Sequence, residues 1–172
     1  MIRRVIASTF AGTLAGAVLT TVALGALALS AHAASKPDPC KLLKTSEISE
    51  QFGGATASPG TKSLTTAVSV GCRFDVAATG DQPDGNIDVR VMTTGAKAAY
   101  NGLKKLAGGD YVPVAGVANS LWSEKTKSLS VLKGTELVTV QALFTSINPL
   151  PVHQLDTRAQ AIALSKLAVK RA

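Results

Sequence analysis

The chain has 172 residues, a formal net charge of +7 and 46% hydrophobic residues. This length suits a single domain that can bury a hydrophobic core. Its lysines and arginines are scattered and its aromatic residues stand singly, which is not the basic stripe with stacking aromatics of a nucleic-acid binder. We therefore expect no nucleic-acid partner. A weak affinity for anionic wall polymers or lipid headgroups is the one role of the charge that we retain.

The first 33 residues are typical of an export signal. Arg3 and Arg4 give a cationic start, residues 5–29 carry no charge, and Ala31-His32-Ala33 matches the pattern after which signal peptidase cuts. We predict a cleavable signal peptide over residues 1–33 that follows the general secretory route, with the twin-arginine route as the alternative. Residues 5–29 could also span a bilayer, so a retained N-terminal anchor in the membrane stays open.

Residues 34–39 read as a short linker, and a single domain is predicted over residues 40–172. Cys40 follows Pro37-Asp38-Pro39 rather than a small apolar tripeptide, so no lipid anchor is expected on it. We expect a secreted, extracytoplasmic monomer of the cell envelope.

A first helix is predicted after Leu43, where Thr45 or Ser46 suits the N-cap. Ile48 and Phe52 would then face inward, and the glycines at 53–54 would end the helix.

A long strand is predicted over residues 64–76, where apolar and polar residues alternate and place Cys72 on the buried face. Turn residues at 79–85 then lead into a partner strand over residues 87–91, which makes a hairpin. From Ala96 the apolar residues no longer alternate with polar ones but recur every three to four residues, which predicts a second helix over residues 96–107.

The C-terminal half predicts three more strands and a last helix. Their expected positions are 121–122, 129–131 and 138–144 for the strands and 155–169 for the helix. The chain is therefore predicted to be α+β, an antiparallel sheet of about five strands packed with three helices in the order α-β-β-α-β-β-β-α.

The only two cysteines, Cys40 and Cys72, are expected to form a disulfide, since both would be exported to an oxidising compartment. Such a bridge would stabilise the fold by about 3 to 4 kcal/mol in the loop-closure model. The alternative is a pair of free buried thiols.

Four motifs suggest chemistry and have simpler explanations. After cleavage His153 is the only histidine left. The sequence has no nucleophile elbow to pair with it, and we interpret it as a surface or helix-entry residue.

The oxygen-rich run at 81–88 lacks the closing glutamate of a calcium loop and suits a turn. Ser130 and Lys133 match Ser-x-x-Lys, but three residues along a strand they face opposite ways. The run 60–63 echoes a phosphate loop at the wrong spacing. We predict no catalytic, metal-binding or cofactor-binding residues and no cofactor.

The motifs Asp38-Pro39-Cys40-x-Leu42-Leu43 and Gly71-Cys72-x-Phe74 resemble those of an actinobacterial family of exported and lipoprotein-like proteins, a domain of unknown function. The stretch 112–117, Leu121-Trp122 and Lys133-Gly134 are similar to that family as well, so the resemblance covers most of residues 37–170. It implies an α+β fold, bridged motif cysteines, kinship with extracytoplasmic sensor domains of actinobacterial kinases, and no catalytic residues. Many relatives carry a lipobox, which this chain lacks.

These observations favour a non-enzymatic binding module for a small apolar ligand or lipid. A cavity lined by Tyr100, Leu103 and Phe144 would support it. The alternative is an extracellular sensor or protein-interaction domain that docks onto an envelope protein, which an exposed sheet face around Trp122 would support. A hydrolase that uses His153 is a remote third hypothesis.

Overall fold

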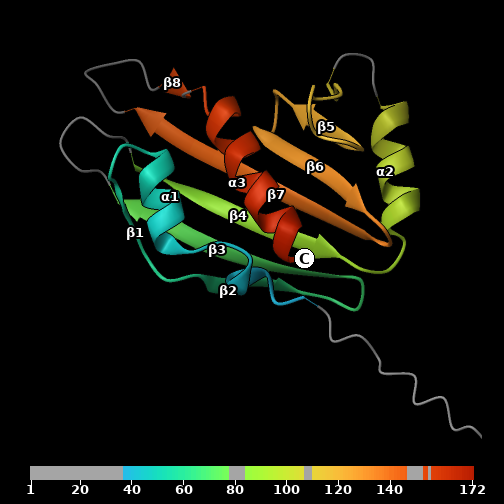
Figure 1. Cartoon of the computed structure of the whole chain (residues 1–172), viewed down its shortest axis with the longest axis horizontal. Coiled ribbons are helices and arrows are strands. Elements are labelled where there is room, and N and C mark those ends of the chain that lie inside the picture. The colour runs from blue at the N-terminus through green and yellow to red at the C-terminus, as the bar shows by residue number, and fades with distance from the viewer. Residues whose placement is uncertain (1–36, 78–83, 107–109, 147–152, 155) are drawn as a thin grey trace, which may run out of the picture. The chain divides into compact units, whose positions relative to one another are not determined.

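The computed structural model describes residues 37–77, 84–106, 110–146, 153–154 and 156–172 (Figure 1). The predicted signal peptide, residues 1–33, and the first half of the predicted linker lie outside these ranges. In the ranges described, no helix is both long and apolar enough to cross a membrane.

The chain contains two long hairpins, β3–β4 and β6–β7, with helices and shorter strands before, between and after them. The elements are the 3-10 helix η1 (Pro39–Lys41), α1 (Thr45–Gln51), β1 (Thr56–Ala57), β2 (Thr61–Thr65), β3 (Ser69–Ala77), β4 (Asp84–Met92), α2 (Ala96–Lys105), β5 (Ser120–Ser123), β6 (Ser128–Lys133), β7 (Glu136–Ser146), β8 (His153–Gln154) and α3 (Arg158–Arg171).

The described strands form one sheet in the order β1-β3-β4-β7-β6-β5, with β2 also paired to β3 and β8 to β7. All these pairings are antiparallel, so the predicted α+β class is confirmed. The eight strands exceed the predicted number of about five. Two of the three additional strands, β1 and β8, have only two residues each, too few to leave an alternation pattern.

The third additional strand arises because the predicted strand 64–76 is divided by a tight turn. Thr66 closes this turn, since its hydroxyl donates to the Ser69 carbonyl and its backbone N–H bonds the same oxygen. Val68 projects into solvent at 42% exposure. The alternation of polar and apolar residues continues through the turn, so periodicity could not reveal it.

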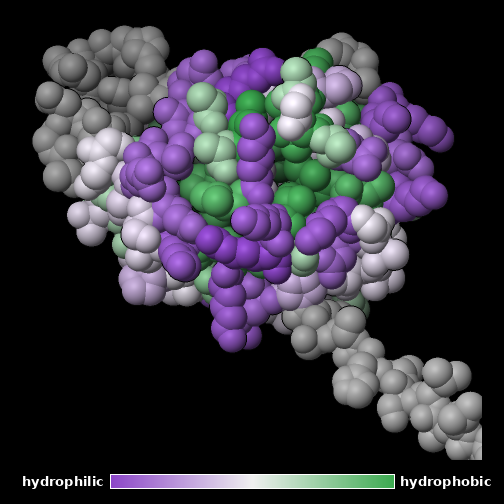
Figure 2. All heavy atoms as spheres, viewed as in Figure 1, coloured by the Kyte–Doolittle hydropathy of each residue, from purple (hydrophilic) through white to green (hydrophobic). Residues whose placement is uncertain are grey.

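The two faces of the sheet are covered differently. Helices α1 and α3 and the η1 turn lie on one face, in the foreground of Figure 1, and α2 lies against β6 and β7. The main core lies under α1 and α3 and includes Phe74, Val89, Leu129, Val140 and Leu164. In Figure 2, the hydrophobic atoms visible on this side lie mainly in the middle, beside α3, with hydrophilic side chains around them.

The predicted disulfide is confirmed. Cys40 in η1 is bonded to Cys72 on β3, with a Cα–Cα distance of 5.1 Å across 32 residues of chain. Cys72 is fully buried, as its strand position predicted. Asp38 holds the other end of the bridge in place, because its carboxylate accepts the Cys40 backbone N–H at 3.1 Å.

Gly60 owes its identity to this bridge. A Cβ at this position would lie 2.6 Å from the Cys72 Sγ and 2.7 Å from the Phe74 ring, closer than side chains can pack. Residues 61–63 are in strand β2 rather than at a helix N-terminus. The glycine of the phosphate-loop echo is therefore explained by packing.

The helix ends differ in detail from the prediction. Lys44, not Thr45 or Ser46, is the N-cap of α1, and the Glu47 carboxylate accepts the Lys44 backbone N–H at 2.9 Å. The last helix begins at Arg158 and ends at Arg171, instead of spanning 155–169. Thr157 precedes it with its buried hydroxyl donating to the Ala142 carbonyl on β7 at 2.7 Å, which fastens the start of α3 to the sheet.

Arg171 joins the last helix to the first. Its guanidinium donates to both Glu47 carboxylate oxygens and, at 2.8 Å, to the Leu42 carbonyl. The hydrogen bond from Arg171 is the main reason that the pKa of Glu47 falls to about 2, and the Lys44 N–H adds to the effect.

Candidate functional site

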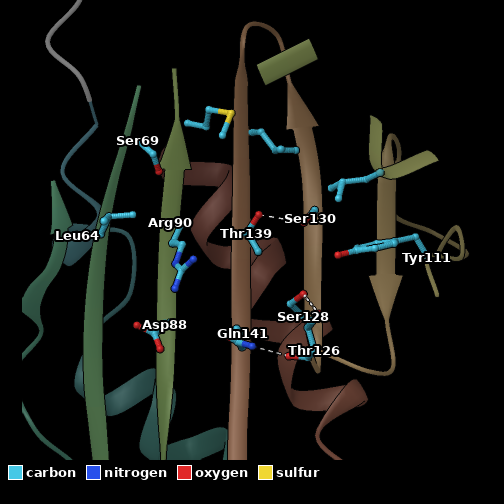
Figure 3. A pocket seen from close by; sticks show the side chains of 13 residues that line it. Leu64, Ser69, Asp88, Arg90, Tyr111, Thr126, Ser128, Ser130, Thr139 and Gln141 are labelled. Atoms are coloured by element: carbon cyan, nitrogen blue, oxygen red, sulfur yellow. Dashed lines mark hydrogen bonds between the residues drawn. The ribbon is translucent and has the colours of Figure 1, made fainter. Parts of the chain in front are cut away.

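A groove of about 400 Å3 lies on the face of the sheet opposite α1 and α3 (Figure 3). Side chains from β4, β6 and β7 form its floor. Leu64 and Ser69 border it on the β2–β3 side, and Leu103 and Tyr111 border it toward α2 and β5. This volume is within the range of small-molecule sites in proteins.

The register of the central strands arranges the floor in rows. Asp88, Arg90 and Met92 project from β4 into the groove, opposite Gln141, Thr139 and Leu137 on β7. Strand β6 continues the first two rows with Ser128 and Ser130. Neighbouring rows are two residues apart along each strand, because alternate side chains point to the same face. The floor therefore changes from the polar row at Asp88 to the apolar row at Met92 over four residues of β4.

The apolar end of the groove is a small core of its own. Tyr100, Leu121 and Leu137 are buried together here, and Met92 and Leu103 pack against them half-buried. Helix α2 supplies both Tyr100 and Leu103. Of these two residues, Leu103 lines the groove and Tyr100 is buried in the small core beside it.

The polar end contains a buried carboxylate with a dedicated partner. Asp88 is 2% exposed and accepts two hydrogen bonds from Arg73, at 2.9 Å from Nη2 and 3.4 Å from Nε. The hydrogen bonds to Asp88 raise the pKa of Arg73 above its ordinary value. The negative charge of Asp88 is thus neutralised within the sheet.

Hydroxyl groups occur in bonded pairs on the floor. Ser130 and Thr139 lie 2.9 Å apart, and Thr126 and Ser128 lie 2.7 Å apart. Gln141 donates its side-chain amide to the Thr126 carbonyl at 2.6 Å. These bonds link the polar side chains of the floor to one another and to the backbone.

The four residues predicted to form a ligand or partner surface lie in two places. Leu103 lines the groove, and Tyr100 is buried in the small core at its apolar end. Trp122 and Phe144, each 1% exposed, are in the main core beneath α1 and α3. Phe144 stacks on Phe52 with ring centroids 4.1 Å apart.

Trp122 is therefore not at the centre of an exposed sheet face. Its indole N–H donates to Glu124 at 2.9 Å, and the Arg158 guanidinium lies 5.9 Å from the centre of its ring. The hydrogen bonds from Lys127 and then from Trp122 lower the pKa of Glu124. The feature that would have supported protein docking at Trp122 is absent.

The other motifs lie in structural settings. Ser130 and Lys133 are both on strand β6, where Ser130 faces the groove and the Lys133 ammonium donates to the carbonyls of Val169 and Ala172. Residues 84–88 of the oxygen-rich run are in β4, and residue 81 lies outside the described ranges. His153 is in β8, and its side chain also lies outside the description. No cluster of three or more acidic, histidine or cysteine residues in the described ranges could hold a metal ion.

Comparison of the chain with protein-family models, with curated proteins and with solved structures finds no match.

The sequence prediction missed the polar floor, above all Arg90, Ser130, Thr139 and Gln141. A signal for them was present, because each is a polar position in a strand whose alternate residues are apolar. That pattern places each side chain on the outer face of its own strand. It does not reveal that β4 and β7 are neighbours, which is what brings these side chains together.

Proposed function

We propose that this protein is a secreted, non-enzymatic binding module of the cell envelope that holds a small apolar ligand or lipid in the groove beneath α2. The observation that carries the proposal is the composition of the groove. One end is built from Met92, Leu103 and Leu137, and its walls come from a sheet and a helix that are already packed. Sites for small ligands are typically preformed hollows that combine apolar walls with a few polar groups.

The disulfide supports the location. A bridge between Cys40 and Cys72 persists in an oxidising environment and is uncommon in proteins of a reducing cytosol. If the predicted signal peptide is cut after Ala33, N-terminal sequencing of protein from a culture supernatant should start at Ala34. A sequence that starts at Met1, or protein found only in membranes, would favour the retained anchor instead.

A matched pair of leucines tests ligand binding in the groove. Leu103 lines the groove, whereas Leu106, at the end of the same helix, is 65% exposed and does not line it. We expect decanol, an uncharged single-chain probe, to bind the wild-type protein in titration calorimetry. Leu103→Gln should weaken its binding about tenfold, since a buried leucine contact is lost, and Leu106→Gln should leave it unchanged.

Failure of decanol to bind the wild-type protein, or an equal loss in both variants, would contradict the proposal. Native mass spectrometry of protein recovered from the supernatant gives an independent reading. A co-purifying lipid supports ligand binding, and a stoichiometric protein partner would instead support the sensor or interaction domain.

A further inference from the structure

Two arginines on the groove side of the sheet are in opposite states. Arg73 on β3 is bonded to both oxygens of the buried Asp88. Arg90 on β4 is exposed, and among the described residues no hydrogen bond or ion pair engages its guanidinium. In Figure 3, the Arg90 side chain runs along β4 toward Asp88, but that carboxylate already belongs to Arg73. Among the described residues, Arg73 therefore has Asp88 bonded to it and Asp75 near it, whereas Arg90 has no carboxylate bonded to it.

The position of Arg90 is as informative as its charge. Arg90 lies two residues from Met92, where the apolar end of the groove begins, and two residues from Asp88, where the polar end begins. Successive residues on one face of a strand are about 7 Å apart. A ligand with its charged group at Arg90 would thus reach the apolar end with its first few carbon atoms.

The strand neighbours of Arg90 differ on its two sides, and one of them adds a donor. Its partner on β3 is Gly71, and β2 packs over that position, since a Cβ there would lie 2.9 Å from the Ser63 Oγ and 3.2 Å from the Leu64 Cβ. Its partner on β7 is Thr139, which is bonded to Ser130. Two hydroxyls carry two hydrogens and their mutual bond uses one, so this pair can still donate to a ligand oxygen.

The helix beside the groove has the same sign of charge. Helix α2 contains Lys97, Lys104 and Lys105 and no acidic residue. These lysines are on its exposed side and add a positive potential that attracts anions at low ionic strength.

From this arrangement we infer that the ligand of the groove is a single-chain anionic amphiphile. Its carboxylate or phosphate binds Arg90 and the Ser130–Thr139 hydroxyl pair, and its hydrocarbon chain lies between Met92, Leu103 and Leu137. The inference rests on the proposed function and adds the charge of the ligand and the residue that recognises it. Arg90 is a binding residue, and Arg73 is bound to Asp88 and takes no part.

The test compares decanoate with decanol, which share a chain and differ in the head group. Both are titrated, below the concentration at which decanoate forms micelles, into the full chain as an expressing host processes it, with the disulfide intact. The wild-type protein should bind decanoate more tightly than decanol. Arg90→Gln should weaken decanoate about tenfold to a hundredfold, the range for loss of a charge-assisted hydrogen bond, and change decanol less than twofold.

Lys166→Gln is the matched control, since it removes one positive charge from the exposed side of α3, which packs on the other face of the sheet. It should leave both affinities unchanged, and Arg90→Lys should retain part of the preference for decanoate. Alkyl phosphate in place of decanoate then distinguishes a phosphate ligand from a carboxylate ligand.

The outcomes separate the two proposals. If both probes bind equally and Arg90→Gln alters neither affinity, the inference is overturned and the proposed function stands. An equal loss of decanoate binding in Lys166→Gln overturns it too, because net charge would then suffice. If decanol does not bind the wild-type protein, the proposed function fails, and the inference that rests on it fails too.

Discussion

The two faces of the sheet are built from the same strands and yet have different physical characters. Under α1 and α3, the inward side chains are aliphatic or aromatic and are excluded from water, as with Val89, Val140 and Leu129. On the opposite side, the residues that alternate with them are polar, and α2 covers only the end near Leu137. The first face supplies stability through burial, and the second displays polar groups on the rigid floor that the first creates.

Replacement of Phe144 should produce the greatest loss. Phe144→Ala removes a buried ring that stacks on Phe52, so the free energy of unfolding should fall by about 3–5 kcal/mol. Thr139→Val, on the same strand but facing the groove, should change it by less than about 1 kcal/mol. Urea denaturation measures both, and equal losses would contradict the contrast between the faces.

Loss of the disulfide should rank next. The double variant Cys40→Ala/Cys72→Ala should unfold with about 3–4 kcal/mol less free energy, since the bridge closes a loop of 32 residues. The wild-type protein should lose the same stability when a reductant is added, whereas the double variant should be indifferent to it. A wild-type melting temperature that reductant leaves unchanged would argue against a structural bridge.

The two arginines of the groove side should respond unequally to one substitution. Arg73→Gln leaves the buried Asp88 without its partner and should cost about 1–3 kcal/mol. Arg90→Gln removes a side chain without a partner in the described structure and should change stability by no more than about 0.5 kcal/mol.

A double variant shows whether the cost comes from Asp88. Arg73→Gln/Asp88→Asn removes the buried charge as well, so it should be more stable than Arg73→Gln alone. Chemical denaturation at neutral pH measures all three. If Arg90→Gln were the more destabilising single change, the assignment of Asp88 to Arg73 would be wrong.

The smallest effect concerns the contact between α1 and α3 and depends on pH. The pKa of Glu47 is about 2 in the folded protein, below its ordinary value of 4.5. A lowered folded pKa means that the ion pair with Arg171 stabilises the protein fully above pH 4.5, and that this contribution is lost as the pH falls toward 2.

Glu47→Gln should therefore be less stable than the wild-type protein at pH 7 by about 1 kcal/mol or less, because Arg171 is partly exposed. The difference should shrink between pH 4.5 and pH 2. Thermal unfolding across this range tests it, and a difference that stayed constant with pH would exclude the ion pair as its source.

Much of the fold was predictable from local pattern. The alternation in residues 87–91 and 138–144, the helical spacing from residue 96 and the disulfide partner on the buried face of its strand all correspond to what the structure contains. The turn at Thr66 was not, because its residues continue the polar and apolar alternation of the strands around it.

The candidate site was less predictable than the fold, and its residues show why. Tyr100 and Leu103 were identified as apolar residues on one helix face, which local spacing determines. Phe144 was expected beside them but lies on the opposite side of the sheet, next to Phe52. Which of two apolar surfaces a side chain joins depends on the order of strands, and no local pattern contains that order.

The sequence by itself determined the three helices and the position of the longer strands, which of their residues are apolar, and the covalent link between Cys40 and Cys72. These follow from side-chain period and from the chemistry of paired thiols, both of which operate over short stretches or on composition alone. Only the tertiary structure decided that β4 lies beside β7, and only it set the register in which Asp88 on β4 pairs with Arg73 on β3. Those two facts leave Arg90 without a bonded carboxylate on the floor of a groove, because strand order and register depend on contacts that no local pattern contains.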